Sequence, residues 1–244
     1  MSRIEALALD LWYTTWYHRA RERANYHRAK RHAWLRTLGD VGVEASTARG
    51  ELDRLRAKLN GLEARGQAST LEQQARWVGQ WLGVRLDTQQ LIERLDRALS
   101  HAAIHPTPGI RAFLAEARTR GMPIGMVSNI CDESPGGIRA RLASEGLLPF
   151  FGSIALSSEF GTAKPDPSLF RHCFQELGAR PDRVLFIGDM PVDRQGAQNV
   201  GAQFVMYLGV DRDSPLAYRR KRRAEPAGTP RASNWSQVRA RFLG

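Results

Sequence analysis

The sequence predicts an α/β fold: a parallel β-sheet covered by helices on both faces, with an all-helical domain inserted after the first strand. Two patterns carry this prediction. From about residue 106 onward, short apolar runs alternate with amphipathic helical segments, which is typical of parallel sheets with right-handed crossovers. Between residues 17 and 105, apolar residues recur only at helical spacing. We therefore expect a Rossmann-like core formed by residues 1–16 and 106–244, and a helical domain formed by residues 17–105.

The elements of the core follow one another in a regular order. Strands are predicted within residues 4–9, 122–128, 151–160, 183–189 and 203–209, the last being the final strand. Helices are predicted within residues 105–121, 135–146, 164–178, 193–201 and 232–243. Prolines at the start of the segment 164–178 favour a helix N-terminus there.

The inserted region is predicted to be a bundle of about four helices. Its amphipathic segments are residues 21–42, 51–66, 69–86 and 86–105. The third begins with Ser69 or Thr70 ahead of Glu72 and Gln73, a pattern that marks the start of a helix.

The composition is that of a globular protein rather than a membrane protein. The chain has 244 residues with 42% hydrophobic residues, and it contains no run of eighteen apolar residues. We find no signal-peptide pattern and expect a cytoplasmic protein, with Cys131 and Cys173 as free thiols. The formal net charge of +11 favours anionic ligands.

Six polar residues stand at or shortly after the ends of the predicted strands. They are Asp10, Ser128, Asn129, Lys164, Asp189 and Asp193. In an open parallel sheet the ligand site lies beyond the carboxyl ends of the strands, so we expect these side chains to converge. Carboxylate groups, a hydroxyl group and an ammonium group in one crevice suit a phosphate group and a divalent cation.

With these residues in view, the chain resembles the haloacid dehalogenase (HAD) superfamily of hydrolases, whose four motifs occur here in order. They are carried by Asp10 and Thr14 in DLWYT, Ser128 and Asn129 at a strand end, Lys164 in AKPDPSLF, and Asp189 and Asp193 in GDMPVD. Four motifs in the right order, each at a strand end or helix start, are a strong signal. The resemblance implies a HAD core and identifies the helical insertion as a cap domain.

The resemblance also implies a role for each motif residue. Asp10 would be the nucleophile that forms a covalent intermediate, and Lys164 would neutralise charge on the transferred group. The substrate would be bound by Thr14, Ser128, Asn129 and Trp12. Mg²⁺ would be held by Asp10, the Trp12 carbonyl and Asp189, with Asp193 supporting the loop and Lys164.

The first motif departs from the D-x-D-G-T pattern of the phosphatases. Trp12 and Tyr13 stand where the second Asp and the Gly are expected. The second Asp serves as general acid and base, and the loss of such a group typically costs about 10²–10⁴-fold in rate. The aromatic side chains around Asp10 are consistent with an apolar pocket and also with a plug that disables the site.

Three functions remain open from the sequence. The first is an Mg²⁺-dependent phosphatase that acts on a small phosphorylated metabolite, and we favour it. The second is a metal-independent 2-haloacid dehalogenase-like enzyme with a halogenated substrate. The third is a catalytically impaired binding or regulatory protein. A Schiff-base mechanism would need a cap lysine of depressed pKa, and neither Lys30 nor Lys58 has surroundings that indicate one.

The basic run YRRKRRAEPAGTP, residues 218–230, is predicted to be a solvated, mobile loop. No nucleic-acid-binding module accompanies it, so we do not expect a nucleic-acid partner. The sequence does not determine the oligomeric state.

Overall fold

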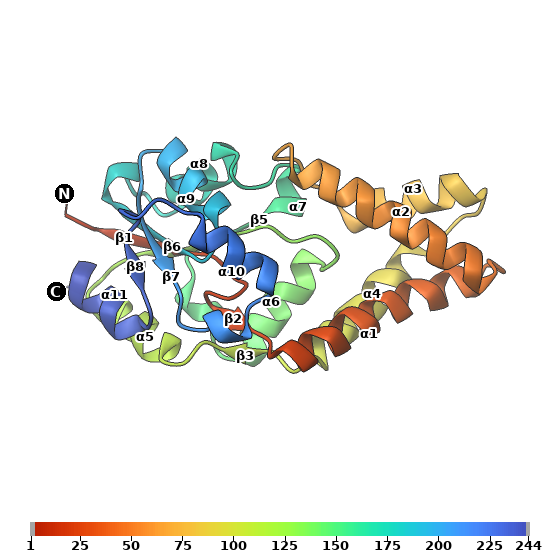
Figure 1. Ribbon diagram of the computed structural model, residues 1–244, viewed down its shortest axis with the longest axis horizontal. Coiled ribbons are helices and arrows are strands. Elements are labelled where there is room, and N and C mark those ends of the chain that lie inside the picture. The colour runs from red at the N-terminus through yellow and green to blue at the C-terminus, as the bar shows by residue number, and fades with distance from the viewer. Residues whose placement is uncertain (1–2, 243–244) are drawn as a thin grey trace.

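A six-stranded sheet with helices on both faces forms the centre of the protein (Figure 1). The structure, a computed structural model, describes residues 3–242. The strands are β1 (Ala6–Leu9), β4 (Ile124–Ser128), β5 (Ser153–Leu156), β6 (Val184–Gly188), β7 (Gln203–Tyr207) and β8 (Arg231–Ala232). Their order is β5-β4-β1-β6-β7-β8, and every neighbouring pair is parallel. The predicted parallel α/β sheet is confirmed. The prediction that β7 is the final strand is wrong, because the two-residue edge strand β8 is too short to produce a sequence pattern.

The helices of this part of the chain alternate with the strands. They are α5 (Ile110–Thr119), α6 (Pro135–Ser144), α7 (Ser157–Phe160), α8 (Pro167–Glu176), α9 (Pro191–Asn199), α10 (Leu216–Arg223) and α11 (Trp235–Phe242). Short 3₁₀ segments cover Leu148–Phe150, Pro181–Arg183 and Asp211–Asp213.

The central strand β1 alternates between large and small side chains, and each kind packs on its own face. Leu7 and Leu9 belong to the cluster that includes residues of α5, α6 and α11. Ala6 and Ala8 belong to the cluster on the other face, with aromatic residues of α8 such as Phe170. Successive side chains of a strand point to opposite faces, so this alternation sets how closely the helices approach.

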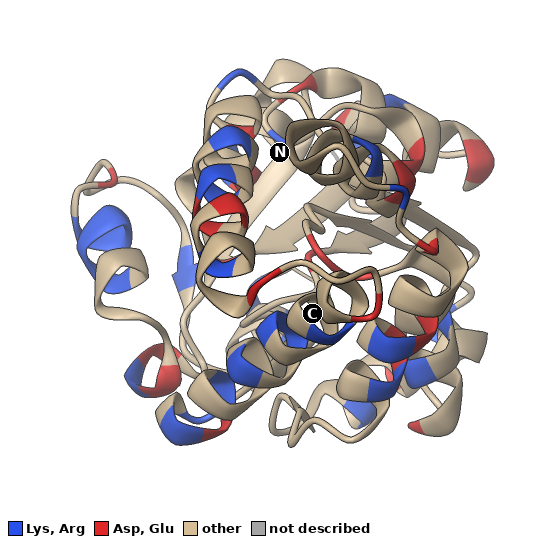
Figure 2. Cartoon of the chain, turned by 90° about the vertical axis from the view of Figure 1, so that its right-hand side faces the viewer, with Lys and Arg blue, Asp and Glu red and all other residues tan. Residues whose placement is uncertain are grey.

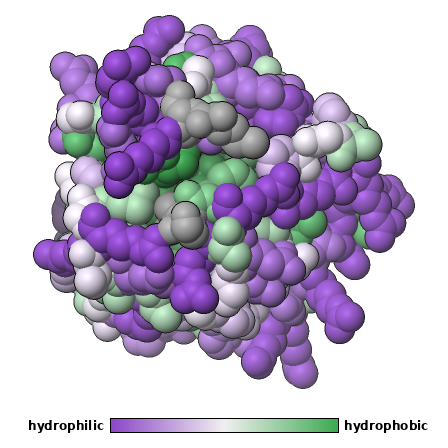
Figure 3. Space-filling view, turned by 90° about the vertical axis from the view of Figure 1, so that its left-hand side faces the viewer, coloured by the Kyte–Doolittle hydropathy of each residue, from purple (hydrophilic) through white to green (hydrophobic). Residues whose placement is uncertain are grey.

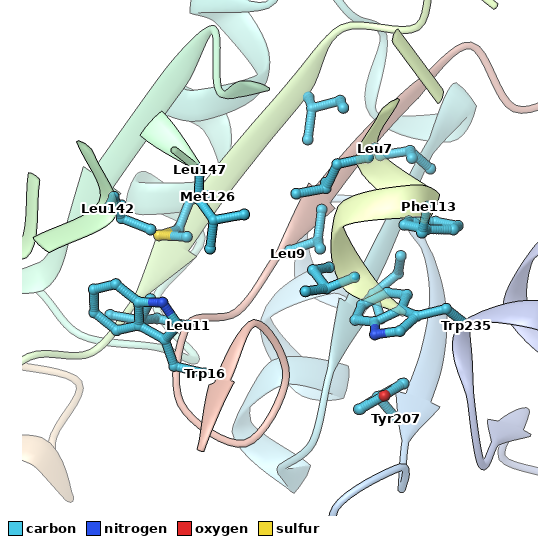
Figure 4. Close-up of a cluster of buried hydrophobic side chains, with 14 of the residues drawn as sticks. Leu7, Leu9, Leu11, Trp16, Phe113, Met126, Leu142, Leu147, Tyr207 and Trp235 are labelled. Atoms are coloured by element: carbon cyan, nitrogen blue, oxygen red, sulfur yellow. The ribbon is translucent and has the colours of Figure 1, made fainter. Parts of the chain in front are cut away.

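The larger cluster fixes the closing helix α11 on the sheet (Figure 4). The Trp235 ring stacks on Tyr207 of β7 at 4.4 Å and lies 4.7 Å from the Phe113 ring of α5. Burying an aromatic side chain of this size stabilises the fold by about 1.5–3 kcal/mol. The helix predicted within residues 232–243 is confirmed as α11, and its Trp235 and Val238 are buried against the core.

A bundle of four helices is inserted between two short strands that pair antiparallel, β2 (Trp16–Tyr17) and β3 (His105–Pro106). The helices are α1 (Ala20–Gly39), α2 (Ala45–Glu63), α3 (Leu71–Leu82) and α4 (Thr88–Ser100), which extend to the right in Figure 1. They enclose a hydrophobic cluster of their own. The predicted start of the third helix is confirmed, since Thr70 caps α3 through a hydrogen bond from the Gln73 amide. This bundle is the helical cap that the sequence predicts.

The surface is polar and its charges are mixed. Figure 2 shows Lys and Arg spread over several helices and interspersed with Asp and Glu. The opposite side is mostly hydrophilic, with a smaller apolar area (Figure 3). Within residues 3–242, no helix combines the length and the apolar character needed to cross a membrane.

Candidate active site

The candidate site lies where the central strand ends. β1 pairs with β4 on one side and with β6 on the other, and Leu9 is in register with Met126 and Ile187. Asp10 comes directly after this position, and its amide donates a hydrogen bond to the Ile187 carbonyl at 2.9 Å. The ends of β4 and β6 therefore carry their polar residues to the same edge of the sheet as Asp10. Neighbouring parallel strands connected in opposite directions leave a crevice at this kind of point.

A buried lysine links two carboxylates in this crevice. Lys164 Nζ lies 2.5 Å from Asp10 Oδ1 and 2.6 Å from Asp193 Oδ1, and it donates to the Val127 carbonyl at 3.1 Å. The Lys164 side chain is 3% exposed. Three acceptors hold the three protons of the ammonium group, so the position of Lys164 is fixed.

Asp193 also shapes the loop after β6. Its Oδ2 accepts hydrogen bonds from the amides of Asp189 at 2.9 Å and Met190 at 2.8 Å, at the N-terminus of α9. A Cβ at Gly188 would lie 2.5 Å from the Asp193 carboxylate. Only glycine leaves room for this carboxylate, which explains the Gly-Asp pair at the end of β6.

The surroundings of Asp10 change the pKa of its carboxyl group. Burial raises the pKa of the Asp10 carboxyl, the Lys164 ammonium lowers it and Asp193 raises it again, so that the pKa is about 6. Burial alone would lower the pKa of Lys164, but the attraction of Asp10 and Asp193 raises it above its ordinary value. At neutral pH the pair is therefore mainly a carboxylate beside an ammonium group.

A cavity of about 520 Å³ opens beside these groups. The sequence-predicted residues on its wall are Asp10, Trp12, Asn129, Lys164, Asp189 and Asp193. The cap contributes Asn60 and Glu63 of α2, and α10 contributes Tyr218 and Lys221. Sequence reasoning missed these last four, which come from segments with no motif of their own.

Two predicted substrate-binding residues are not on this wall. Ser128 is buried at the end of β4, with its Oγ 3.5 Å from the Asn129 carbonyl. Thr14 is fully buried, and its hydroxyl has no hydrogen-bond partner among the described residues. Their contact with a substrate stays a prediction.

Asn129 holds the backbone of Lys164. Its Oδ1 accepts from the Lys164 amide at 2.7 Å, and its Nδ2 donates to the Lys164 carbonyl at 3.3 Å. The same Nδ2 lies 3.3 Å from Glu63 Oε1 of the cap. Asn129 therefore orients the lysine and touches the cap at one place.

Trp12 is one of the residues on the wall of the cavity. Its ring stacks on His18 at 5.0 Å with an interplanar angle of 18°, and the rings of Trp16 and Tyr26 lie at 5.8 and 6.3 Å. Tyr26 belongs to α1, so these contacts join the loop after β1 to the cap.

Tyr13 occupies the backbone conformation that favours glycine, with φ at +58°. Its hydroxyl accepts a hydrogen bond from Arg23 of α1 at 3.2 Å, and its ring meets Tyr218 of α10 edge-on at 5.7 Å. The strain of the left-handed conformation is thus offset by contacts on two sides.

The basic run was predicted to be a solvated loop, and this prediction is wrong for residues 218–223. They lie in the helix α10, and Arg222 is only 3% exposed. Its Nε donates to the Asp189 carbonyl at 2.6 Å, and its Nη2 pairs with the Asp189 carboxylate. Tyr218 and Arg222 are four residues apart, which places an aromatic and a cationic side chain on one helix face.

The acidic residues of the site include donors that suit Mg²⁺. Asp10, Asp189 and Asp193 each offer a carboxylate oxygen within 4.8 Å of the others. Carboxylate and carbonyl oxygens are the ligands that Mg²⁺ prefers. The donor set fits the ion in chemistry, although Asp189 is shared with a guanidinium group.

The cap is fastened to the core by a second buried lysine. Lys30 of α1 lies 2.6 Å from Asp132 and 2.7 Å from Glu133, which follow β4. Burial alone would lower the pKa of Lys30, but the two carboxylates raise it above its ordinary value. The amine is therefore protonated at neutral pH, which disfavours Schiff-base chemistry at this lysine.

Comparisons with known proteins identify the family of the chain. The family model of haloacid dehalogenase-like hydrolases matches residues 5–201. A phosphoserine phosphatase of Thermus thermophilus is 30% identical over 191 residues, covering 77% of this chain and 72% of the relative. A phosphoglycolate phosphatase of Rhodobacter capsulatus is 31% identical over 109 residues, so that the match spans 45% of this chain and 48% of that enzyme.

Solved structures share the fold along nearly the whole chain. A 2-haloacid dehalogenase from Pseudomonas syringae pv. tomato has a TM-score of 0.67 at 19% identity, with 97% of both chains covered. A HAD phosphatase from Thermococcus onnurineus has a TM-score of 0.65 at 17% identity, covering 99% of this chain and 98% of the other.

Proposed function

The chain belongs to the haloacid dehalogenase-like hydrolases, and on that premise we propose that it is a phosphatase acting on a small phosphorylated metabolite. The observation that carries the proposal is the contact of 2.5 Å between Lys164 Nζ and Asp10 Oδ1 at the wall of a cavity. The names of the sequence relatives, phosphoserine and phosphoglycolate phosphatase, support a small substrate.

In the proposed reaction, Asp10 attacks the phosphorus atom and the oxygen of the leaving group departs with its electron pair. The product is an acyl phosphate on Asp10, which water then hydrolyses to restore the carboxylate. Lys164 holds Asp10 in its ionised form and lies where it can neutralise the phosphoryl oxygens. Asn129 fixes Lys164 through its backbone, and Ser128 is proposed to bind a phosphoryl oxygen.

Mg²⁺ is proposed to bind between Asp10, the Trp12 carbonyl and Asp189. When bound, the ion supplies positive charge that stabilises the phosphoryl group in the transition state. The cluster of three carboxylates supports this assignment.

No carboxylate stands beside Asp10 at the position of Trp12 to protonate the leaving group. An indole N–H is a donor only and cannot act as a base. We therefore propose that the chain works best on substrates whose leaving group departs without a proton, such as acyl phosphates.

Residues 17–105 are proposed to be the unit that moves as the cap, with the ribbon of β2 and β3 as its base. The free thiols of Cys131 and Cys173 support our proposal that the chain works in a reducing compartment such as the cytoplasm.

The test is phosphate release from acetyl phosphate and p-nitrophenyl phosphate, with Mg²⁺ and with a chelator. Turnover should require Mg²⁺, and Asp10→Asn should lower kcat/KM by at least about 10³-fold. Asp182→Asn, the same change at an exposed position, is the matched control. Turnover that survives Asp10→Asn would exclude Asp10 as the nucleophile.

A second candidate is halide displacement from a 2-haloacid. The observation in its favour is that a tryptophan, rather than an acidic residue, lies two positions after Asp10 on the wall of the cavity. Halide release from 2-chloropropionate in the presence of a chelator would establish it. A folded chain that releases neither phosphate nor halide would instead favour a binding or regulatory role.

A further inference from the structure

The guanidinium group of Arg222 forms an ion pair with Asp189. Arg222 lies on α10, outside the four motifs, and uses all three of its nitrogens. Nε and Nη2 bind the carbonyl and the carboxylate of Asp189, while Nη1 donates to Asp211 Oδ1 at 2.7 Å and Ser214 Oγ at 2.9 Å. A buried guanidinium with this many acceptors is held in one geometry.

The helix that carries Arg222 is docked at the site at both ends. Near its beginning, Tyr218 packs edge-on against Tyr13, three residues after Asp10. Just after its end, Glu225 forms an ion pair with Arg194 of α9, and both side chains are largely buried. α10 therefore spans from the loop after β1, which carries Asp10, to α9, which begins two residues after Asp189.

The guanidinium of Arg222 and a divalent cation would share one carboxylate. Arg222 Nη2 pairs with the carboxylate of Asp189, and both side chains are almost fully buried. Two cations held against one buried carboxylate repel each other at short range, so we expect the guanidinium to oppose the entry of a metal ion.

We propose that Arg222 competes with a divalent cation for Asp189, so that Mg²⁺ enters only when α10 withdraws its guanidinium. The inference rests on the proposed assignment of Asp189 as a metal ligand. According to this inference, Arg222 of the basic run occupies the metal position in the absence of the ion. The docking of α10 and the binding of the metal are then mutually exclusive.

The test is the affinity for Mg²⁺ alone, measured by titration calorimetry on the full chain without substrate. Arg222→Met removes the charge and keeps the buried aliphatic stem. Because this variant lacks the cation beside the metal position, it should bind Mg²⁺ more tightly, with a Kd at least about tenfold lower than that of the unchanged chain. Arg223→Met, the same change at the exposed neighbour, should bind Mg²⁺ as the unchanged chain does. Arg222→Lys, which keeps a cation, should resemble the unchanged chain.

A second measurement needs no variant and stands if Arg222→Met fails to fold. Saturating Mg²⁺ should speed hydrogen exchange at the amides of residues 216–223 in the unchanged chain, because α10 leaves its docked position. Equal Mg²⁺ affinity with and without Arg222 would overturn the inference, and so would an unchanged or slower exchange of α10. A folded Arg222→Met that binds no Mg²⁺ would overturn it as well.

These outcomes are separate from those of the phosphatase assay. Turnover that depends on Asp10, without any effect of Arg222 on Mg²⁺ affinity, leaves the proposed function intact and removes this inference. Tighter Mg²⁺ binding by Arg222→Met in a chain without turnover would support this inference and remove the proposed function.

Discussion

Replacing Trp12 with aspartate places a carboxylate two residues after Asp10, on the wall of the same cavity. A positioned general acid and base is worth about 10²–10⁴-fold in rate. Trp12→Asp should therefore raise kcat/KM by about that factor for an alkyl phosphate, whose leaving group needs a proton. For acetyl phosphate, whose leaving group needs none, the gain should be far smaller.

The substitution also removes the stack of the indole on His18 and its contacts with Trp16 and Tyr26. Trp12 is half-buried. Full truncation of a core aromatic side chain costs about 3–5 kcal/mol, so we expect roughly half, about 2 kcal/mol. A domain of ordinary stability stays folded after this loss, and the kinetic effect can be read without a correction for unfolded protein.

Trp12→Ala is the matched control, because it opens the cavity by the same route without adding a carboxylate. The assay compares kcat/KM for glycerol phosphate and acetyl phosphate in the unchanged chain and both variants. A gain for glycerol phosphate that is equal in the two variants, or absent from both, would refute the reasoning that Trp12 stands in the place of the missing acid.

Three further changes test the buried contacts by urea denaturation. Lys164→Met should lower the free energy of unfolding by about 3–5 kcal/mol, because it leaves the buried Asp10 beside a second carboxylate; an unchanged stability would contradict the ion pairs. Lys30→Met should cost a similar amount, about 3–5 kcal/mol, between about pH 4 and pH 10. This contribution should be lost in acid below the lowered pKa of Asp132 and in alkali above the raised pKa of Lys30, so a loss centred at neutral pH would speak against it. Tyr13→Gly should relieve the positive φ but lose a buried ring, for a net cost of about 2 kcal/mol; a gain in stability would show that the strain outweighs the packing.

The parts of the site that the sequence predicts are those that follow from local pattern. Asp10 and Asp189 each come directly after a buried apolar run, and parallel strands bring their ends together whatever the rest of the chain does. Thr70 caps α3 by accepting a hydrogen bond from the amide of Gln73, three residues later, so four consecutive residues are enough to predict this cap. In these cases the features that determine the structure lie within a few residues of one another in the sequence.

The parts that the sequence does not predict depend on contacts between distant segments. Arg222 is buried because Asp189, 33 residues earlier, accepts its hydrogen bonds, and a run of arginines looks the same whether it is solvated or docked. Lys30 finds its carboxylates 102 and 103 residues away. Such pairings carry no local periodicity, and only the folded chain displays them.

The central claim is that Asp10 forms a covalent bond with the transferred group. The most direct measurement is an acid quench of the full chain with ³²P-labelled acetyl phosphate during turnover, followed by peptide mapping. We predict a label that is released by hydroxylamine, as an acyl phosphate is, and that maps to the peptide containing Asp10. Turnover without any label on that peptide would contradict the claim.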